Sequence, residues 1–154
     1  MRMVMRKALH VGALVLAASL ALRARSVEAD PQVVHVYKSA TCGCCQKWVD
    51  HVRSQGYTVT VENVPDVAPV KRNLGVPSTT QSCHTAVIGN YFVEGHVPAQ
   101  DIARLLAEHP DIAGLAVPGM PIGSPGMEGP NPQSYRVLAV HKDGKVDVFA
   151  EHRP

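Results

Sequence analysis

Apolar and polar positions along the chain change their spacing several times and predict an alternation of strands and helices. The apolar run at residues 33–37 is short, β-branched and free of Gly and Pro, which indicates a buried strand. Apolar side chains then recur every three or four positions between residues 44 and 55, which predicts a helix that ends before Gly56. A second β-branched run, at residues 58–61, predicts the next strand.

The following segment predicts a short helix, a β-hairpin and a third helix. The short helix is expected at residues 66–74, where its two prolines fall near the start. Strands at residues 85–88 and 91–94 flank Gly89-Asn90, and a two-residue turn of this type is typical of a hairpin. The third helix is expected to begin at Pro98 and to continue through Glu108.

A long stretch at residues 111–134 is rich in Gly and Pro and has neither a helical nor a strand period. Loops of this length in compact domains are usually functional or disordered. Two strands close the chain, at residues 135–140 and 145–150, and Asp143-Gly144 joins them. The pattern predicts an α/β sandwich in the order strand, helix, strand, helix, hairpin, helix, followed by a long Gly/Pro loop and a C-terminal β-hairpin.

Residues 1–29 are expected to be a cleavable export signal. Three basic side chains precede an apolar stretch at residues 8–22, and Val27-Glu28-Ala29 offers small residues at the cleavage position. The apolar stretch is short for a membrane span and basic residues follow it, so no stable membrane anchor is expected after cleavage. Residues 30–154 then form a single exported domain.

Removal of this segment reverses the sign of the net charge. The full chain has 15 Lys and Arg against 13 Asp and Glu, a formal net charge of +2. The segment holds five basic side chains and one acidic one, so the remainder is slightly acidic. No basic patch remains that would favour nucleic acid as a partner.

The cysteines are the residues that most clearly indicate chemistry. Three of the four lie in Cys42-Gly43-Cys44-Cys45, and the fourth, Cys83, comes just before His84. Cysteines of exported proteins often form structural disulfides, but a bridge within residues 42–45 would close almost no loop. In the predicted fold Cys42 is the N-cap of the first helix, a place that favours thiolates. Because thiolates are both metal ligands and nucleophiles, both roles stay open.

The motif and its place after the first strand resemble the thioredoxin fold, whose active site is C-G-P-C at that point. Cys42 and Cys45 match the two redox cysteines, and Cys44 stands where that family has proline. Thioredoxins also carry a cis-proline just before the third strand, whereas Cys83-His84 occupy that loop here and Pro77 lies too far upstream. The resemblance implies, as an alternative function, a periplasmic thiol–disulfide oxidoreductase with Cys42 and Cys45 as its catalytic pair.

The number of sulfurs favours a metal over disulfide exchange. An exchanger needs only Cys42 and Cys45, whereas Cys44 and Cys83 would add ligands for a soft ion. Soft thiolates favour Cu(I), with zinc less favoured, because three cysteines within four residues are awkward for one tetrahedral ion. Bridging thiolates in a multinuclear Cu(I) cluster fit this spacing better.

Several residues near the motif are open to two interpretations. His84 ligates a metal or orients a thiolate, or else it satisfies backbone groups of its loop. Met120 and Met127 offer thioether ligands or pack the long loop onto the core. His96 is expected to be structural or at the surface, and Trp48 to be a core residue.

A set of motifs runs through residues 33–150: Tyr37-Lys38, Cys42-Gly43-Cys44-Cys45 with Trp48, Val76-Pro77-Ser78, Ser82-Cys83-His84-Thr85, Val93-Glu94-Gly95-His96-Val97-Pro98, Gly114-Leu115-Ala116-Val117-Pro118-Gly119-Met120-Pro121 and Gly123-Ser124-Pro125-Gly126-Met127. In these motifs the chain resembles the CopG-like family of small exported copper-resistance proteins, long catalogued as a domain of unknown function. The resemblance implies a thioredoxin-like periplasmic protein that binds copper through these cysteines and helps cells to tolerate copper. Copper ions and other periplasmic copper-handling proteins are the implied partners, and redox activity as a copper or thiol oxidoreductase is left open.

Overall fold

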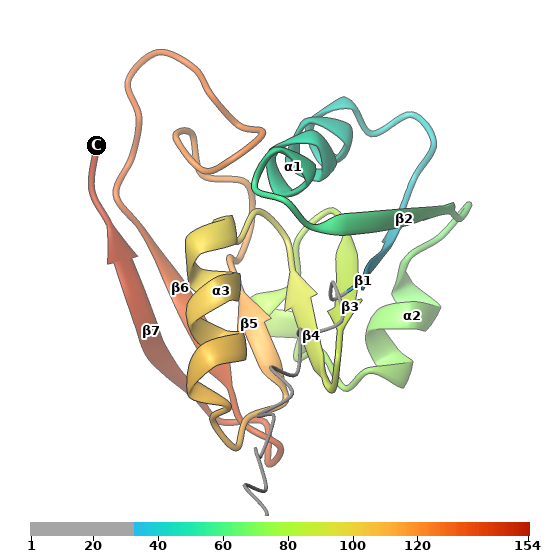
Figure 1. Ribbon diagram of the computed structural model, residues 1–154, viewed down its shortest axis with the longest axis vertical. Helices are drawn as coiled ribbons and strands as arrows, with labels where there is room; N and C mark the ends of the chain where they lie inside the picture. Colours follow the sequence, from blue (N-terminus) through green and yellow to red (C-terminus); the bar gives the residue numbers. More distant parts are fainter. Residues whose placement is uncertain (1–32) are drawn as a thin grey trace, which may run out of the picture.

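The computed structural model describes residues 33–154, which build one seven-stranded mixed sheet with helices on both faces (Figure 1). The predicted signal segment, residues 1–29, lies outside the described residues. The elements in chain order are β1 (Val33–Lys38), α1 (Gly43–Ser54), β2 (Thr58–Asn63), α2 (Ala68–Asn73), a short 3-10 turn (Ser78–Thr80), β3 (Thr85–Ile88), β4 (Tyr91–Glu94), α3 (Ala99–Glu108), β5 (Gly114–Ala116), β6 (Tyr135–Val140) and β7 (Val146–His152).

The strands lie in the order β2-β1-β3-β4-β5-β6-β7. The β1/β2 and β4/β5 pairs are parallel, and all other neighbours are antiparallel. The predicted mixed α/β order is observed as far as α3, and the β3–β4 hairpin has the predicted bounds. In its turn only Gly89 takes a positive φ, of 56°.

Strand β5 corrects the prediction that residues 111–134 contain no strand. Its three residues are all buried, so they show none of the alternation that would reveal a strand in the sequence. They become a strand by pairing with β4 on one side and β6 on the other. Gly114 permits this approach, since a Cβ there would lie 2.2 Å from the Phe92 carbonyl oxygen. The C-terminal hairpin therefore extends the sheet through β5.

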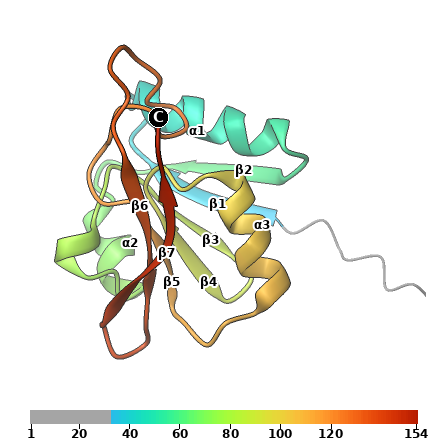
Figure 2. The ribbon, with the colours of Figure 1, turned by 90° about the vertical axis from the view of Figure 1, so that its left-hand side faces the viewer.

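Helices α1 and α3 pack on one face of the sheet, and α2 covers the other (Figures 1 and 2). The main core lies beneath α1 and α3 and includes Trp48 and Ile102 from these helices. A smaller cluster on the α2 side contains Val76 and Phe92. Within residues 33–154, no helix combines the length and the apolar character needed to cross a membrane.

Candidate metal centre

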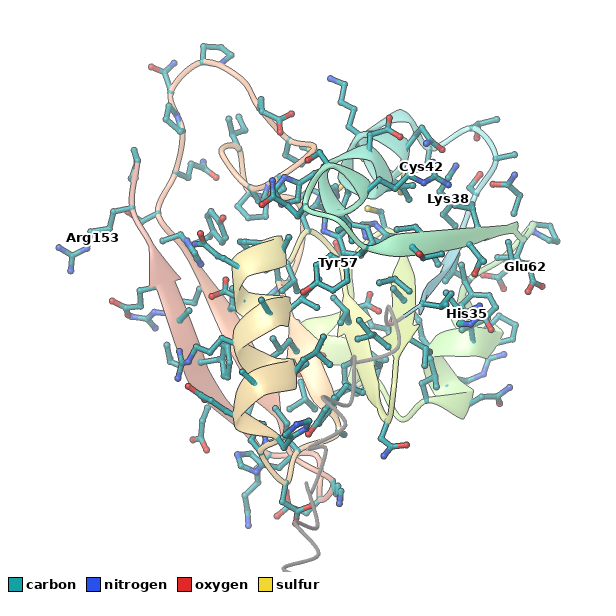
Figure 3. All side chains as sticks on the ribbon, in the orientation of Figure 1. His35, Lys38, Cys42, Tyr57, Glu62 and Arg153 are labelled. Atoms are coloured by element: carbon teal, nitrogen blue, oxygen red, sulfur yellow. A yellow bond between two sulfur atoms is a disulfide. The ribbon has the colours of Figure 1, made fainter. Side chains whose placement is uncertain are left out.

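The motif cysteines lie at the beginning of α1, next to the end of β1 (Figure 3). Cys42 is the N-cap residue, with extended backbone angles and no side-chain cap, and Cys44 and Cys45 fall in the first turn. The first N–H groups of a helix have no partners within the helix and favour negative charge at this end. Cys45 is fully buried, whereas Cys42 and Cys44 are partly exposed. The helix start thus presents two sulfurs toward its surface and one toward the core.

Cys83 approaches these sulfurs from the loop before β3. All four Sγ atoms lie within 4.8 Å of one another. Cys42 and Cys45 are joined by a disulfide, while Cys44 and Cys83 are free thiols. The Cys42 and Cys44 sulfurs are 3.5 Å apart. The structure therefore brings together all four cysteines, with one pair oxidised.

The Cys42–Cys45 disulfide lies within the motif, where a bridge is expected to close almost no loop. It joins residues three positions apart, so it constrains the unfolded chain weakly and contributes little to stability. Its position instead places a reducible bond next to two free thiols. Two electrons and two protons would convert it into two further thiols, Cys42 and Cys45.

Two buried histidines lie close to the Cys83 sulfur. The Cys83 Sγ lies 3.1 Å from His96 Nε2 and 3.4 Å from His84 Nδ1. The other ring nitrogen of His96, Nδ1, lies 2.8 Å from the Pro125 carbonyl oxygen, which only accepts hydrogen bonds. Nδ1 must therefore carry the proton, and this leaves the Nε2 lone pair facing the thiol. His96 is thus oriented as an acceptor or a metal ligand.

His96, which the sequence predicts to be structural or at the surface, is buried and lies beside the Cys83 sulfur. The register of the predicted hairpin nevertheless indicates that His96 lies near Cys83. Thr85 pairs with Glu94 across β3 and β4, so Cys83, two residues before Thr85, comes opposite His96, two residues after Glu94. The predicted Gly89-Asn90 turn fixes this register and could have placed the imidazole beside the thiol.

Burial sets the protonation of the groups around Cys83. It raises the pKa of the Cys83 thiol to about 11, with a further contribution from the nearby Cys44. Burial also lowers the pKa of His84 well below its usual value, and the neighbouring His96 and Lys71 act in the same direction. Among the described residues, His84 Nε2 is the buried side-chain polar atom left without a hydrogen-bond partner. His84 is therefore a neutral imidazole with one unused nitrogen.

The Gly/Pro segment between β5 and β6 packs against the beginning of α1. Gly126 has a φ of 86°, and a Cβ there would lie 2.7 Å from the Cys44 carbonyl oxygen and 2.8 Å from the Trp48 nitrogen. The same segment supplies the Pro125 carbonyl that orients His96. Trp48 itself is buried and donates its indole N–H to the Val97 carbonyl oxygen at 2.8 Å, as a core residue.

The two candidate methionines differ in position. Met127 is partly buried and lines a cavity of about 390 Å³, whose other lining residues are Gly43, Cys44, Lys47, Ile122, Gly126, Glu128 and Gly129. Met120 is 51% exposed. Of these two methionines, Met127 therefore lines the same cavity as a cysteine.

The comparisons with known proteins agree with this architecture. A family described as "Protein of unknown function, DUF411" matches residues 80–127. The solved structure "Copper resistance protein copG- Form 2" is 46% identical, with a TM-score of 0.77, and the alignment covers 80% of this chain and 100% of that one. "Copper resistance protein copG- Form 1" is 45% identical, with a TM-score of 0.76, covering 81% of this chain and all of that one.

The chain belongs to the CopG copper-resistance family. No match is found among curated protein sequences. The two CopG structures are matched along their whole length, so the likeness includes both the cysteine-bearing half and the β5–β7 half. The resemblance drawn from the sequence motifs is thereby confirmed at the level of the family.

Proposed function

We propose that this chain is a periplasmic protein of copper resistance or homeostasis that binds Cu(I) through Cys42, Cys44, Cys45 and Cys83. The observation that carries the proposal is the convergence of four sulfurs within 4.8 Å of one another. A set of four soft thiolates suits Cu(I), and sulfurs this close can bridge more than one ion, which favours a multinuclear cluster. Membership of a family whose solved members are titled copper resistance proteins supports the choice of metal.

Loading requires the reduced form of the site. With Cys42 and Cys45 joined, only Cys44 and Cys83 can offer thiolates. A dithiol reductant would transfer two electrons and two protons to the disulfide and become a disulfide itself. Binding then releases thiol protons, since thiolates are the ligands. Copper capacity should therefore depend on the oxidation state of this pair.

The two histidines would complete the ligand set on the Cys83 side. His96 directs an unprotonated Nε2 at the Cys83 sulfur, and burial holds His84 neutral, the form in which imidazole binds metals. Met127 opens onto the cavity beside Cys44 and would supply a soft ligand or cover for the cluster. Met120, which is exposed, would contribute least.

Copper loading of the reduced and the oxidised protein tests this proposal. After anaerobic incubation with excess Cu(I) and removal of unbound metal, elemental analysis should find at least one tightly held copper per reduced chain. The oxidised protein should hold much less, and Cys83→Ser should lower both stoichiometry and affinity. Met120→Leu is the control, expected to match the unsubstituted protein. Substoichiometric copper in the reduced protein that a weak chelator removes would contradict the proposal.

A thiol–disulfide oxidoreductase is the second candidate, and the Cys42–Cys45 disulfide specifically favours it. In this reading Cys42 attacks a substrate disulfide and Cys45 resolves the mixed disulfide, while Cys44 and Cys83 are dispensable. Reduction of insulin disulfides separates the candidates. Exchange is supported if Cys42→Ser abolishes the reaction while Cys44→Ser/Cys83→Ser retains it, and it is excluded if none of the proteins exceeds the thiol background.

Export is part of the proposal and has its own test. Expression of the full chain in a Gram-negative host, followed by fractionation, should recover a shortened protein from the periplasm. Sequencing its N-terminus should find Asp30 as the first residue if cleavage follows Ala29. Full-length protein confined to the cytoplasm would contradict it.

A further inference from the structure

One buried carboxylate holds the chain on both sides of Cys83 and His84. Glu94, at the end of β4, is fully buried. Its Oε1 accepts the backbone N–H of Ser82 at 2.6 Å, and its Oε2 accepts the Thr85 hydroxyl at 2.6 Å. Ser82 and Thr85 are the residues immediately before and after the Cys83-His84 pair. A single side chain therefore fixes the two ends of the segment that presents the sulfur.

The positive charge that pairs with Glu94 comes from α2, on the face of the sheet opposite α1 and α3 (Figure 2). Lys71 of α2 is also buried, and its Nζ donates to Glu94 Oε1 and, at 3.0 Å, to the Thr85 hydroxyl. Burial raises the pKa of Glu94, whereas the Lys71 charge and the three hydrogen bonds favour the ionised form. The pair thus links α2, β3, β4 and the Cys83 loop in one connected polar network.

Folding stability alone does not account for such a pair. Taking two charges out of water costs about as much as their attraction returns, and well-packed apolar replacements are often as stable. What an apolar pair cannot supply is a bidentate acceptor for Ser82 and Thr85. The specific contribution of Glu94 is therefore the geometry of the segment it holds.

Neighbouring contacts leave little room for a different geometry. The Gly95 N–H donates to the His84 carbonyl oxygen at 3.0 Å. A Cβ on Gly95 would lie 2.5 Å from the Ser82 Cβ, so the two backbones pack closely. The hydroxyl of Ser82 also donates to the Gly119 carbonyl oxygen in the long loop. A shift of Ser82 would therefore move both Cys83 and the loop against α1.

We infer that Lys71 and Glu94 form a positioning unit that holds the Cys83 sulfur within reach of the sulfurs at the beginning of α1. Neither residue touches the metal in this reading, and both act through the Ser82–Thr85 segment. The purpose of the unit rests on the proposed copper function. The positioning itself can be measured without copper.

The test measures how close Cys44 and Cys83 are held in solution. In a Cys42→Ser/Cys45→Ser background these two are the only remaining thiols. Oxidised glutathione converts them into a Cys44–Cys83 disulfide and becomes two molecules of reduced glutathione. The equilibrium in glutathione buffers of known composition gives the effective concentration of one thiol at the other. This quantity reports geometry in the folded protein.

Glu94→Gln and Lys71→Met/Glu94→Gln should each lower this effective concentration about tenfold or more, the effect of losing a hydrogen bond to a charged group. The double variant buries no unpaired charge and should remain folded, as circular dichroism checks, so a result is available even if Glu94→Gln fails to fold. The control is Asp101→Asn, which changes another buried carboxylate, one that pairs with His152 of β7 rather than with the Ser82–Thr85 segment. It should leave the effective concentration unchanged.

Two results would overturn the inference. One is a folded double variant with the same effective concentration as the background, and the other is an equal loss in Asp101→Asn. Copper loading is scored separately on the unsubstituted protein. Failure to bind copper together with a Glu94-dependent effective concentration would reject the proposed function and retain the positioning unit. Copper binding together with an effective concentration that does not depend on Glu94 would support the proposed function and reject the positioning unit.

Discussion

Two buried carboxylates of this molecule each pair with a basic side chain, and the two partners differ in their exposure. Glu94 pairs with Lys71, and both side chains are almost completely buried. Asp101 pairs with His152 at 2.7 Å and ties α3 to β7, with the imidazole 19% exposed. Asp101 pairs with a histidine that is partly exposed, whereas Glu94 pairs with a lysine that is almost completely buried. We therefore expect the loss of a carboxylate to be most destabilising where its partner is buried as well.

The largest expected difference between the two sites is in stability after one partner is removed. Glu94→Ala leaves Lys71 buried without its counterion and should lower the free energy of unfolding by about 3–5 kcal/mol. Asp101→Ala removes the partner of the partly exposed His152 and should cost about 1–3 kcal/mol. Urea denaturation of both variants measures the difference. Equal losses would mean that the two sites are energetically equivalent.

A second contrast is between two glycines, one in the loop that packs against α1 and one in the turn between β6 and β7. Gly126 and Gly144 have similar φ values, 86° and 83°, but only Gly126 is closely surrounded. Gly144→Ala should cost about 1 kcal/mol from backbone strain alone. Gly126→Ala adds contacts with the backbone of α1 and should cost about 2–4 kcal/mol.

Displacement of the loop in Gly126→Ala should also expose the first turn of α1. Alkylation of Cys44 should then be faster than in the unsubstituted protein, whereas Gly144→Ala should not change it. Mass spectrometry after timed treatment with iodoacetamide measures this rate. An unchanged Cys44 rate in a destabilised Gly126→Ala protein would show that the loop does not cover the thiol.

The smallest effect is expected on the exposed surface of the C-terminal hairpin. Arg136 and Glu151 form an ion pair across β6 and β7 at 3.0 Å, with both side chains about half or more exposed. Arg136→Gln should lower the free energy of unfolding by less than about 1 kcal/mol, and added salt should reduce the difference further. Thermal unfolding at low and high salt checks it, and a larger loss would indicate a role in packing.

Local patterns predicted the parts of the fold that depend on neighbours in sequence. The β3–β4 hairpin could be found because its turn and its two apolar runs lie together. The N-cap position of Cys42 followed in the same way from the start of a periodic helix. Strand β5 could not be found, since three buried residues carry no period and are made a strand by β4 and β6.

The sequence indicates that the four cysteines converge, as the structure shows, but it does not indicate the residues that hold Cys83 in place. Clustered cysteines indicate metal binding or thiol chemistry by their residue type alone. Lys71 and Glu94 look like ordinary surface charges in a helix and at a strand end, and only the packing of α2 against the sheet reveals that they are buried. His96 lay between these cases, because the hairpin register would have placed it opposite Cys83.

The place of β5 in the sheet has a consequence for how the molecule can be divided. Because β5 joins β4 to β6, a chain cut after α3 would leave β4 paired with β3 alone and its other edge without a ladder partner. Such a fragment would keep all four cysteines yet present an open strand edge to other copies of itself. A minimal cysteine-bearing fragment of this protein is therefore expected to aggregate, and grafting this half onto another scaffold would require a substitute for β5.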